Sequence, residues 1–199
     1  MLNSLTIRSV SDVWVRLGIV LAVLALTVAA TMVFAFLHAF DPDPQPRFAL
    51  IDQDGRAFTE AHLRGQWSLV YFGFTSCPKV CPTQMSKLTQ LTNELESQDF
   101  DSRLQPVFIT VDPDNDDVQA IGDYLEHFHP RFVGLTGEPA ALDAAARSFG
   151  ALTRAAGSDT PAFHSSTIYL MDPSGRLVDY LPFEATVPEL RRRVAETMP

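Results

Sequence analysis

The sequence predicts an α/β fold with a mixed central sheet, preceded by one N-terminal transmembrane helix. Short apolar runs bounded by turn residues recur along the chain, and stretches with helical periodicity separate them. Two of the runs, 67–74 and 106–112, are almost continuously apolar, which is typical of strands buried on both faces by helices. A third observation predicts the membrane helix: the 21 residues from Leu17 to Leu37 carry no charge.

The uncharged segment is long enough to cross a bilayer. At about 1.5 Å per residue it forms roughly 31 Å of helix, and a bilayer core is about 30 Å thick. Arg8 and Arg16 precede it and the sequence DPDP at 41–44 follows it, so the positive-inside rule predicts a cytoplasmic N-terminus and an exported remainder. A cleaved signal peptide is the alternative, with LHA at 37–39 as a weak cleavage site. The apolar part of a signal peptide is usually shorter, about 7–15 residues.

We therefore expect a cytoplasmic N-terminus at 1–16, a transmembrane anchor at 17–38, a linker at 39–46 and one folded domain at 47–199. The anchor would lie in the inner (cytoplasmic) membrane, with the domain in the periplasm or an equivalent exported space. The net charge is −9, and the first 40 residues hold two arginines and one aspartate, so the exported part carries −10. This charge argues against nucleic acid or anionic lipid as a partner.

The elements of the domain follow from the periodicity. The expected strands occupy 47–52, 67–74, 106–112, 166–172 and 177–183. The expected helices occupy 82–97, 116–128, 138–150 and 188–197. Gly150 is expected to follow the end of the third helix. The turn sequence DPSG at 172–175 joins the last two strands, which should therefore pair antiparallel.

The only two cysteines lie in the sequence FTSCPKVCPTQ at 74–84, where a central strand ends and a helix begins. If Cys77 and Cys81 stand at positions i and i+4 of one helix, their Cα atoms are about 6 Å apart, within the range of a disulfide. The partial positive charge of a helix N-terminus favours thiolate over thiol. We therefore expect two converging thiols of low pKa.

Three interpretations of this pair are open. A structural disulfide would close a loop of only three intervening residues and would restrain the unfolded chain little. A thiol–disulfide oxidoreductase usually has the spacing C-x-x-C, one residue shorter. A soft-metal site is the third, since two thiolates favour Cu(I), whereas structural zinc needs four ligands. A third donor would decide between them.

The five histidines are the candidates for that donor. His38 lies at the membrane exit, His62 in an exposed turn, and His127 and His129 at a helix end, where a positive side chain stabilises the helix dipole. His164 lies in a loop that enters the strand at 166–172, and such loops lie at the functional edge of an open sheet. A lone loop histidine is more often structural, so the residues alone do not decide.

Four segments resemble the Sco/SenC copper-chaperone family in order and spacing: YFGFTSCPKVCPTQMSKL, VFITVDPDND, RFVGLTG and FHSSTIYLMDPSGRLV. The resemblance spans about residues 47–190, and the N-terminal anchor also matches. It implies a thioredoxin-like fold and a copper site made by Cys77, Cys81 and His164. It further implies a membrane-anchored metallochaperone that helps assemble the binuclear copper centre of cytochrome c oxidase. The implied cargo is Cu(I), with Cu(II) as the alternative.

The partner implied by the resemblance is the copper-bearing subunit of cytochrome c oxidase or another copper chaperone. A non-enzymatic role is expected, and the alternatives are an oxidoreductase that acts on the acceptor's cysteines through Cys77 and Cys81, or a copper or redox sensor. One position departs from the family, which commonly has aspartate where this chain has Lys79. A cation there would stabilise thiolates and reverse the charge that a docking partner meets.

Three further segments have structural interpretations. The acidic run DPDNDD at 112–117 lacks the glycine and the distant glutamate of a calcium loop, and is expected to end a strand and begin a helix. Asp112 should lie near the thiols, where it could tune them or contact a partner. Lys87 should lie on a solvated helix face, and the arginines at 191–193 on the last helix.

Overall fold

The computed structural model describes residues 10–39, 45–97, 104–154 and 162–198 of the chain. The chain divides into two compact units, Met1–Pro42 and Asp43–Pro199. In the first, helix α1 spans Val10–Ala39, and its segment Trp14–Phe34 is long and apolar enough to cross a membrane. The predicted helix is therefore present. Arg8, and the linker apart from residues 39, 45 and 46, lie outside the described residues.

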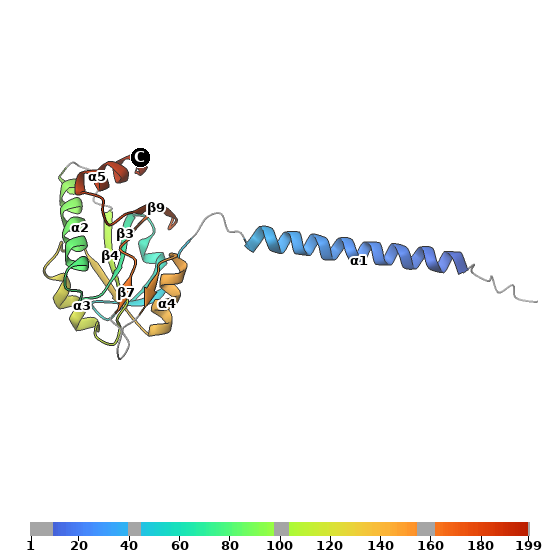
Figure 1. Cartoon of the computed structure of the whole chain (residues 1–199), viewed down its shortest axis with the longest axis horizontal. Coiled ribbons are helices and arrows are strands. Elements are labelled where there is room, and N and C mark those ends of the chain that lie inside the picture. The colour runs from blue at the N-terminus through green and yellow to red at the C-terminus, as the bar shows by residue number, and fades with distance from the viewer. Residues whose placement is uncertain (1–9, 40–44, 98–103, 155–161, 199) are drawn as a thin grey trace, which may run out of the picture. The chain divides into compact units, whose positions relative to one another are not determined.

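The second unit is built on a seven-stranded mixed sheet (Figure 1). Its strands, in spatial order, are β2 (Ala57–Thr59), β1 (Ala49–Asp52), β5 (Val133–Thr136), β4 (Leu104–Thr110), β3 (Trp67–Gly73), β8 (Ile168–Met171) and β9 (Leu177–Leu181). The three central strands β5, β4 and β3 are parallel, whereas β1 and β8 run antiparallel to their central neighbours. The last two strands pair antiparallel, as predicted from the turn between them.

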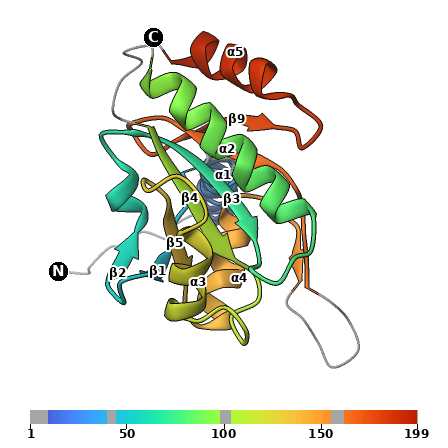
Figure 2. The same ribbon diagram turned by 90° about the vertical axis from the view of Figure 1, so that its left-hand side faces the viewer.

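Helices cover both faces of the sheet. One face carries α2 (Val80–Glu96), α3 (Val118–Leu125) and α5 (Val187–Thr197), and the other carries α4 (Pro139–Ser148). Helices α2 and α5 pack side by side (Figure 2). Strand β3 is almost continuously apolar because both of its faces are covered: Leu69 and Tyr71 pack under α2, while Val70 and Phe72 pack toward α4. The predicted α/β sandwich is confirmed.

Several short elements were not predicted from the sequence. These are β2, β5, the 3₁₀ helix η1 (Glu60–Leu63) and a separate two-stranded ribbon of β6 (Thr153–Arg154) and β7 (Phe163–His164). Strand β5 has only four residues and contains Gly134, which weakens a strand pattern. The glycine is needed because a Cβ at Gly134 would collide with Ile121 and Leu125 of α3. Gly150 follows α4 with a positive φ of 67°, as predicted for the residue after a helix end.

The expectation about Lys87 is corrected. Lys87 does not project into solvent: its Nζ donates to the carbonyls of Phe183 at 2.6 Å and Ala185 at 3.1 Å and lies 4.8 Å from the Phe183 ring centre. It thereby ties α2 to the connection between β9 and α5. The arginines at 191–193 lie on the last helix, as expected, and Arg193 pairs with Asp179 of β9 at 2.6 Å.

Candidate metal centre

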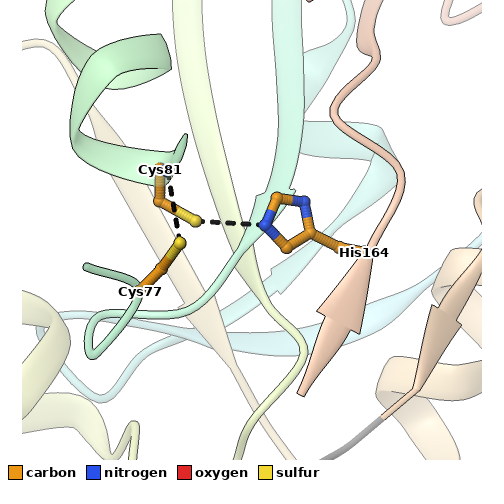
Figure 3. Close-up of side chains that lie close together, drawn as sticks. All are labelled: Cys77, Cys81 and His164. Atoms are coloured by element: carbon orange, nitrogen blue, oxygen red, sulfur yellow. Dashed lines mark hydrogen bonds between the residues drawn. The ribbon is translucent and has the colours of Figure 1, made fainter. Parts of the chain in front are cut away.

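Two cysteines and one histidine converge beyond the carboxyl end of the inner strand β3 (Figure 3). The sulfurs of Cys77 and Cys81 and a ring nitrogen of His164 all lie within 4.8 Å of one another. The Sγ of Cys81 is 3.2 Å from Nε2 of His164, and the backbone N–H of Cys81 donates to Sγ of Cys77 at 3.4 Å. The histidine that sequence analysis could single out only by resemblance therefore lies against the thiols.

The cysteines do not share a helix, contrary to the prediction. Helix α2 begins at Val80, so Cys81 lies in its first turn and Cys77 lies in the preceding loop. The reason is Pro82. In a helix that began at Cys77, Pro82 would fall in the interior, where its missing N–H and its ring break the helix. With Val80 first, Pro82 lies among the first four residues, whose N–H groups have no partner within the helix.

Gly73, the last residue of β3, makes room for the Cys81 sulfur. A Cβ at Gly73 would lie 3.0 Å from Sγ of Cys81 and 2.7 Å from the ring of Phe108. Because the glycine leaves this space empty, Sγ of Cys81 packs directly on the end of the central strand. Cys81 is fully buried and Cys77 only half-buried.

His164 is held on three sides. It lies in β7, a two-residue strand, and not in the predicted loop at 157–167, of which residues 157–161 lie outside the described residues. Its ring meets Tyr71 and Phe74 edge-on, with ring centres 5.5 and 5.8 Å apart. Its Nδ1 lies 3.2 Å from the Ser165 carbonyl oxygen, an acceptor only, so Nδ1 carries the proton. Nε2 then presents its lone pair to the thiols. Burial lowers the pKa of His164, which keeps the ring neutral.

The two thiols differ, contrary to the expectation of two low pKa values. Burial raises the pKa of Cys77, but hydrogen bonds from Cys81 and from the backbone N–H groups of Lys79 and Val80 outweigh it, so the net pKa is lowered. Burial dominates at Cys81 and raises its pKa to about 12 in the metal-free protein. The site therefore combines one readily ionised thiol with one that stays protonated at neutral pH until a cation replaces its proton.

Tyr71 is a member of the site that sequence analysis missed. Its hydroxyl lies 3.7 Å from Sγ of Cys81 and donates to it. Burial raises the pKa of Tyr71, so the phenol keeps its proton and remains a donor. The sequence gives little indication of this role, because Tyr71 lies within an apolar run that is typical of a buried strand.

The three other histidines whose side chains are described do not join the centre. His62 is exposed in η1, and its Nδ1 accepts from the Thr59 N–H. His127 is exposed at the end of α3, with Nδ1 3.1 Å from the Asp123 carbonyl oxygen. His129 is buried and lies 3.4 Å from Glu96. His38 lies where no side chain is described. The structural roles expected for His127 and His129 are consistent with these contacts.

A groove of about 350 Å³ opens beside the centre. It is lined by residues 163–167, which include His164, and by residues 182–184. Two sulfurs and one imidazole nitrogen form a donor set that suits a soft cation. Of the three candidate ligands, His164 also lines this groove.

The sequence of the chain is similar to that of known proteins. Residues 38–199 match the family model described as SCO1/SenC. The chain is 44% identical to the human mitochondrial SCO2 homologue over 140 residues, which cover 68% of this chain and 53% of that protein. It is 40% identical to a SCO2-like protein of Rickettsia conorii over 148 residues, covering 72% of this chain and 71% of that protein. The chain thus spans about half the length of the human relative.

Solved structures of similar proteins share the fold. The structure of yeast Sco1 with copper bound matches with a TM-score of 0.71 at 35% identity, over 75% of this chain and 85% of that one. The structure of Arabidopsis thaliana ScoI with copper bound matches with a TM-score of 0.73 at 35% identity, over 77% and 96% of the two chains. The fold is thioredoxin-like, as the resemblance implied.

Proposed function

Because the chain belongs to the SCO1/SenC family, we propose that it is a membrane-anchored copper metallochaperone that helps assemble the binuclear copper centre of cytochrome c oxidase. Copper is the cargo, held by Cys77, Cys81 and His164. The observation that carries the proposal is the convergence of three ligand atoms within 4.8 Å at the edge of a thioredoxin-like sheet.

The donor set favours Cu(I). Thiolates are soft ligands and select Cu(I) among biologically available ions, and the imidazole nitrogen completes a three-coordinate site. Such a site binds tightly and still admits a further ligand. A ligand of the acceptor, which is the copper-bearing subunit of the oxidase or another copper chaperone, would approach along the groove beside His164. Copper then passes by stepwise ligand exchange.

The apolar helix α1 supports a tethered mode of action. A donor fixed to the membrane that holds its acceptor meets that acceptor at a raised effective concentration. The distribution of charge around the segment supports an exported domain, with the anchor in the inner (cytoplasmic) membrane.

One observation favours a second candidate, a thiol–disulfide oxidoreductase that keeps the acceptor's cysteines reduced. Cys77 is half-buried with a lowered pKa, while Cys81 is buried with a raised one. An accessible thiolate beside a buried thiol is the arrangement that disulfide exchange uses, because the first attacks and the second resolves the mixed disulfide. Oxidation to a Cys77–Cys81 disulfide would remove both sulfur ligands, so redox state would also gate copper binding.

The test is copper stoichiometry measured beside reductase activity. The full chain, reduced and in detergent, is loaded with Cu(I) and freed of excess metal, and the same preparation is assayed with a disulfide substrate. A metallochaperone retains one copper per chain and reduces the substrate slowly. Wild-type protein that retains no copper but turns over the disulfide substrate would replace the first candidate with the second.

A further inference from the structure

A buried carboxylate lies next to the cysteine loop. Asp116 follows β4 and is 0% exposed. Its Oδ1 accepts from the Thr75 hydroxyl at 2.5 Å, and its Oδ2 accepts from the Thr75 N–H at 3.0 Å and from the Thr110 hydroxyl at 2.6 Å. A buried carboxylate is costly unless it is hydrogen-bonded. Two of the three bonds that stabilise it come from one residue, Thr75.

Thr75 belongs to the loop that carries a candidate ligand. It stands two residues before Cys77, and the Cys77 N–H donates to the Phe74 carbonyl at 3.2 Å, which closes a turn around Thr75. A residue held through both its N–H and its hydroxyl has little freedom to move. The position of the Cys77 sulfur therefore depends on what holds Thr75.

Asp116 is itself fixed. Its N–H donates to the Asp112 carbonyl at 2.9 Å, and its own carbonyl accepts from the Thr136 hydroxyl of β5 at 2.8 Å. The next residue, Asp117, is the N-cap of α3 and accepts from the Ala120 N–H at 2.8 Å. The carboxylate is thus anchored to β4, β5 and α3 before it reaches the loop.

We propose that Asp116, acting through Thr75, is the positioning residue that holds the Cys77 loop in its ligating conformation. The inference rests on the proposed copper site and adds to it a residue that contacts no metal. It also gives a role to the acidic run 112–117. Asp112, which the sequence predicted near the thiols, is buried and bonds to Asn115, and the carboxylate that bonds to the cysteine loop is that of Asp116.

Pre-organisation is the physical reason for such a device. Metal–ligand distances tolerate errors of only about 0.2 Å, and removing an outer-shell partner typically lowers metal affinity by about 10–100-fold. The loop between β3 and α2 also packs on the core through Phe74 and Cys77, and the bonds to Asp116 fix the residue between them. Two charge-assisted bonds to a rigid carboxylate restrict it more strongly than neutral bonds would.

The experiment compares isosteric substitutions of two threonines that each donate a hydrogen bond to Asp116. Thr75→Val removes the hydroxyl that binds the carboxylate, and Thr136→Val removes the hydroxyl that binds the Asp116 backbone carbonyl. Both remove one hydrogen bond in the same network, but only the first involves the cysteine loop. Thr75 is half-buried and in a loop, so its valine variant keeps the core intact. Thr75→Ser restores the hydroxyl.

Two readouts are taken on the full chain in detergent. The first is hydrogen–deuterium exchange of the peptide covering residues 74–79 in the metal-free, reduced protein. The second is Cu(I) affinity by competition with a chromophoric chelator. Thr75→Val should accelerate exchange of this peptide about tenfold and weaken copper binding about tenfold. Thr136→Val should leave both within about twofold of wild type, and Thr75→Ser should recover both.

Wild-type exchange in Thr75→Val would overturn the inference, because the loop would then be held by something else. Faster exchange in Thr75→Val together with wild-type copper affinity would also overturn the inference. Failure of wild-type protein to bind copper is a different result: it removes the proposed function, while the exchange data still decide whether Asp116 holds the loop. Asp116→Asn, which keeps the shape and removes the charge, should reproduce Thr75→Val in the exchange measurement.

Discussion

Nε2 of His164 lies 3.2 Å from Sγ of Cys81, although 83 positions separate the two residues in the chain. The Ser165 carbonyl orients the imidazole, and Tyr71 and Phe74 pack against it, so its lone pair points at the thiols before any metal arrives. A neutral, oriented imidazole requires neither deprotonation nor rotation on binding a cation.

His164→Ala should therefore weaken Cu(I) binding more than about tenfold, because loss of a ligand costs more than loss of an outer-shell partner. The domain should still fold, and the Cys77–Cys81 disulfide should still form. Affinity is measured by chelator competition and the disulfide by mass spectrometry. His127→Ala is the matched control, since that side chain is exposed at the end of α3 and should not affect affinity. Wild-type affinity in His164→Ala would reduce the site to two cysteines.

The two thiols should react in a fixed order in the metal-free, reduced protein. The nucleophile is the thiolate, so the lowered pKa of Cys77 gives it more reactive species at pH 7. Cys81, whose pKa is raised to about 12, should stay protonated until the solution is strongly alkaline, and its sulfur is also buried. Iodoacetamide should modify Cys77 at least about tenfold faster at pH 7, and the rate at Cys81 should keep rising toward pH 12. Cys77→Ser and Cys81→Ser isolate each rate; equal rates at pH 7 would contradict the assignment.

This difference between the cysteines marks the limit of what the sequence predicts. The start of the helix can be predicted from the sequence, because prolines precede a stretch of apolar residues with helical spacing. The burial of Cys81 is not visible, since it depends on Gly73 of β3 and on Phe108 of the neighbouring strand. Sequence reasoning therefore identified the electrostatic effect and missed the desolvation that opposes it.

The same reasoning explains the other outcomes. The long, nearly continuous apolar strands β3 and β4 were predicted because their pattern is local. Strand β5 was missed because it contains Gly134, which has a low strand propensity. A glycine is required there because α3 packs too closely for a Cβ. Lys87 was assigned to solvent because its helix position is polar, but its carbonyl partners lie nearly a hundred residues away, on the connection between β9 and α5.

Lys87→Met should destabilise the domain through the loss of those contacts. The substitution keeps the apolar stem and removes an ammonium that donates to the carbonyls of Phe183 and Ala185. Hydrogen bonds to a charged group contribute about 1.5–3 kcal/mol, so the free energy of unfolding should fall by about 2 kcal/mol. The melting temperature should then drop by roughly 4–8 °C. Lys79→Met, at the chain's only other lysine, is the control and should change stability by less than about 0.5 kcal/mol, because that side chain is exposed.

The orientation of the anchor is tested by a reporter fused after Pro199. Arg16 precedes the apolar segment and acidic residues follow it, so the C-terminal domain should be exported. An enzyme that folds only in an oxidising compartment should be active in this fusion. A reporter that works only in the cytoplasm should be inactive in the matched fusion. Activity of the cytoplasmic reporter would reverse the predicted topology.

Deletion of Val80 separates the metallochaperone from the oxidoreductase. Val80 is the first residue of α2, between the Cys77 loop and Cys81. Its removal creates C-x-x-C, the spacing favoured for disulfide exchange, and turns the Cys81 position by about 100° relative to the loop. A metallochaperone needs both sulfurs and His164 to converge on one ion, so the deletion should lower copper affinity and oxidase assembly together.

An oxidoreductase needs only thiol exchange, so assembly should persist or improve in the same variant. The measurement is complementation of a host that lacks its own copy, with oxidase activity and bound copper followed in parallel. Val80→Ala, which keeps the spacing, is the control and should retain both. Because the deletion can raise reductase activity while it removes copper binding, the two functions change in opposite directions in one protein. Wild-type oxidase activity without copper binding would defeat the metallochaperone and establish thiol exchange as the function.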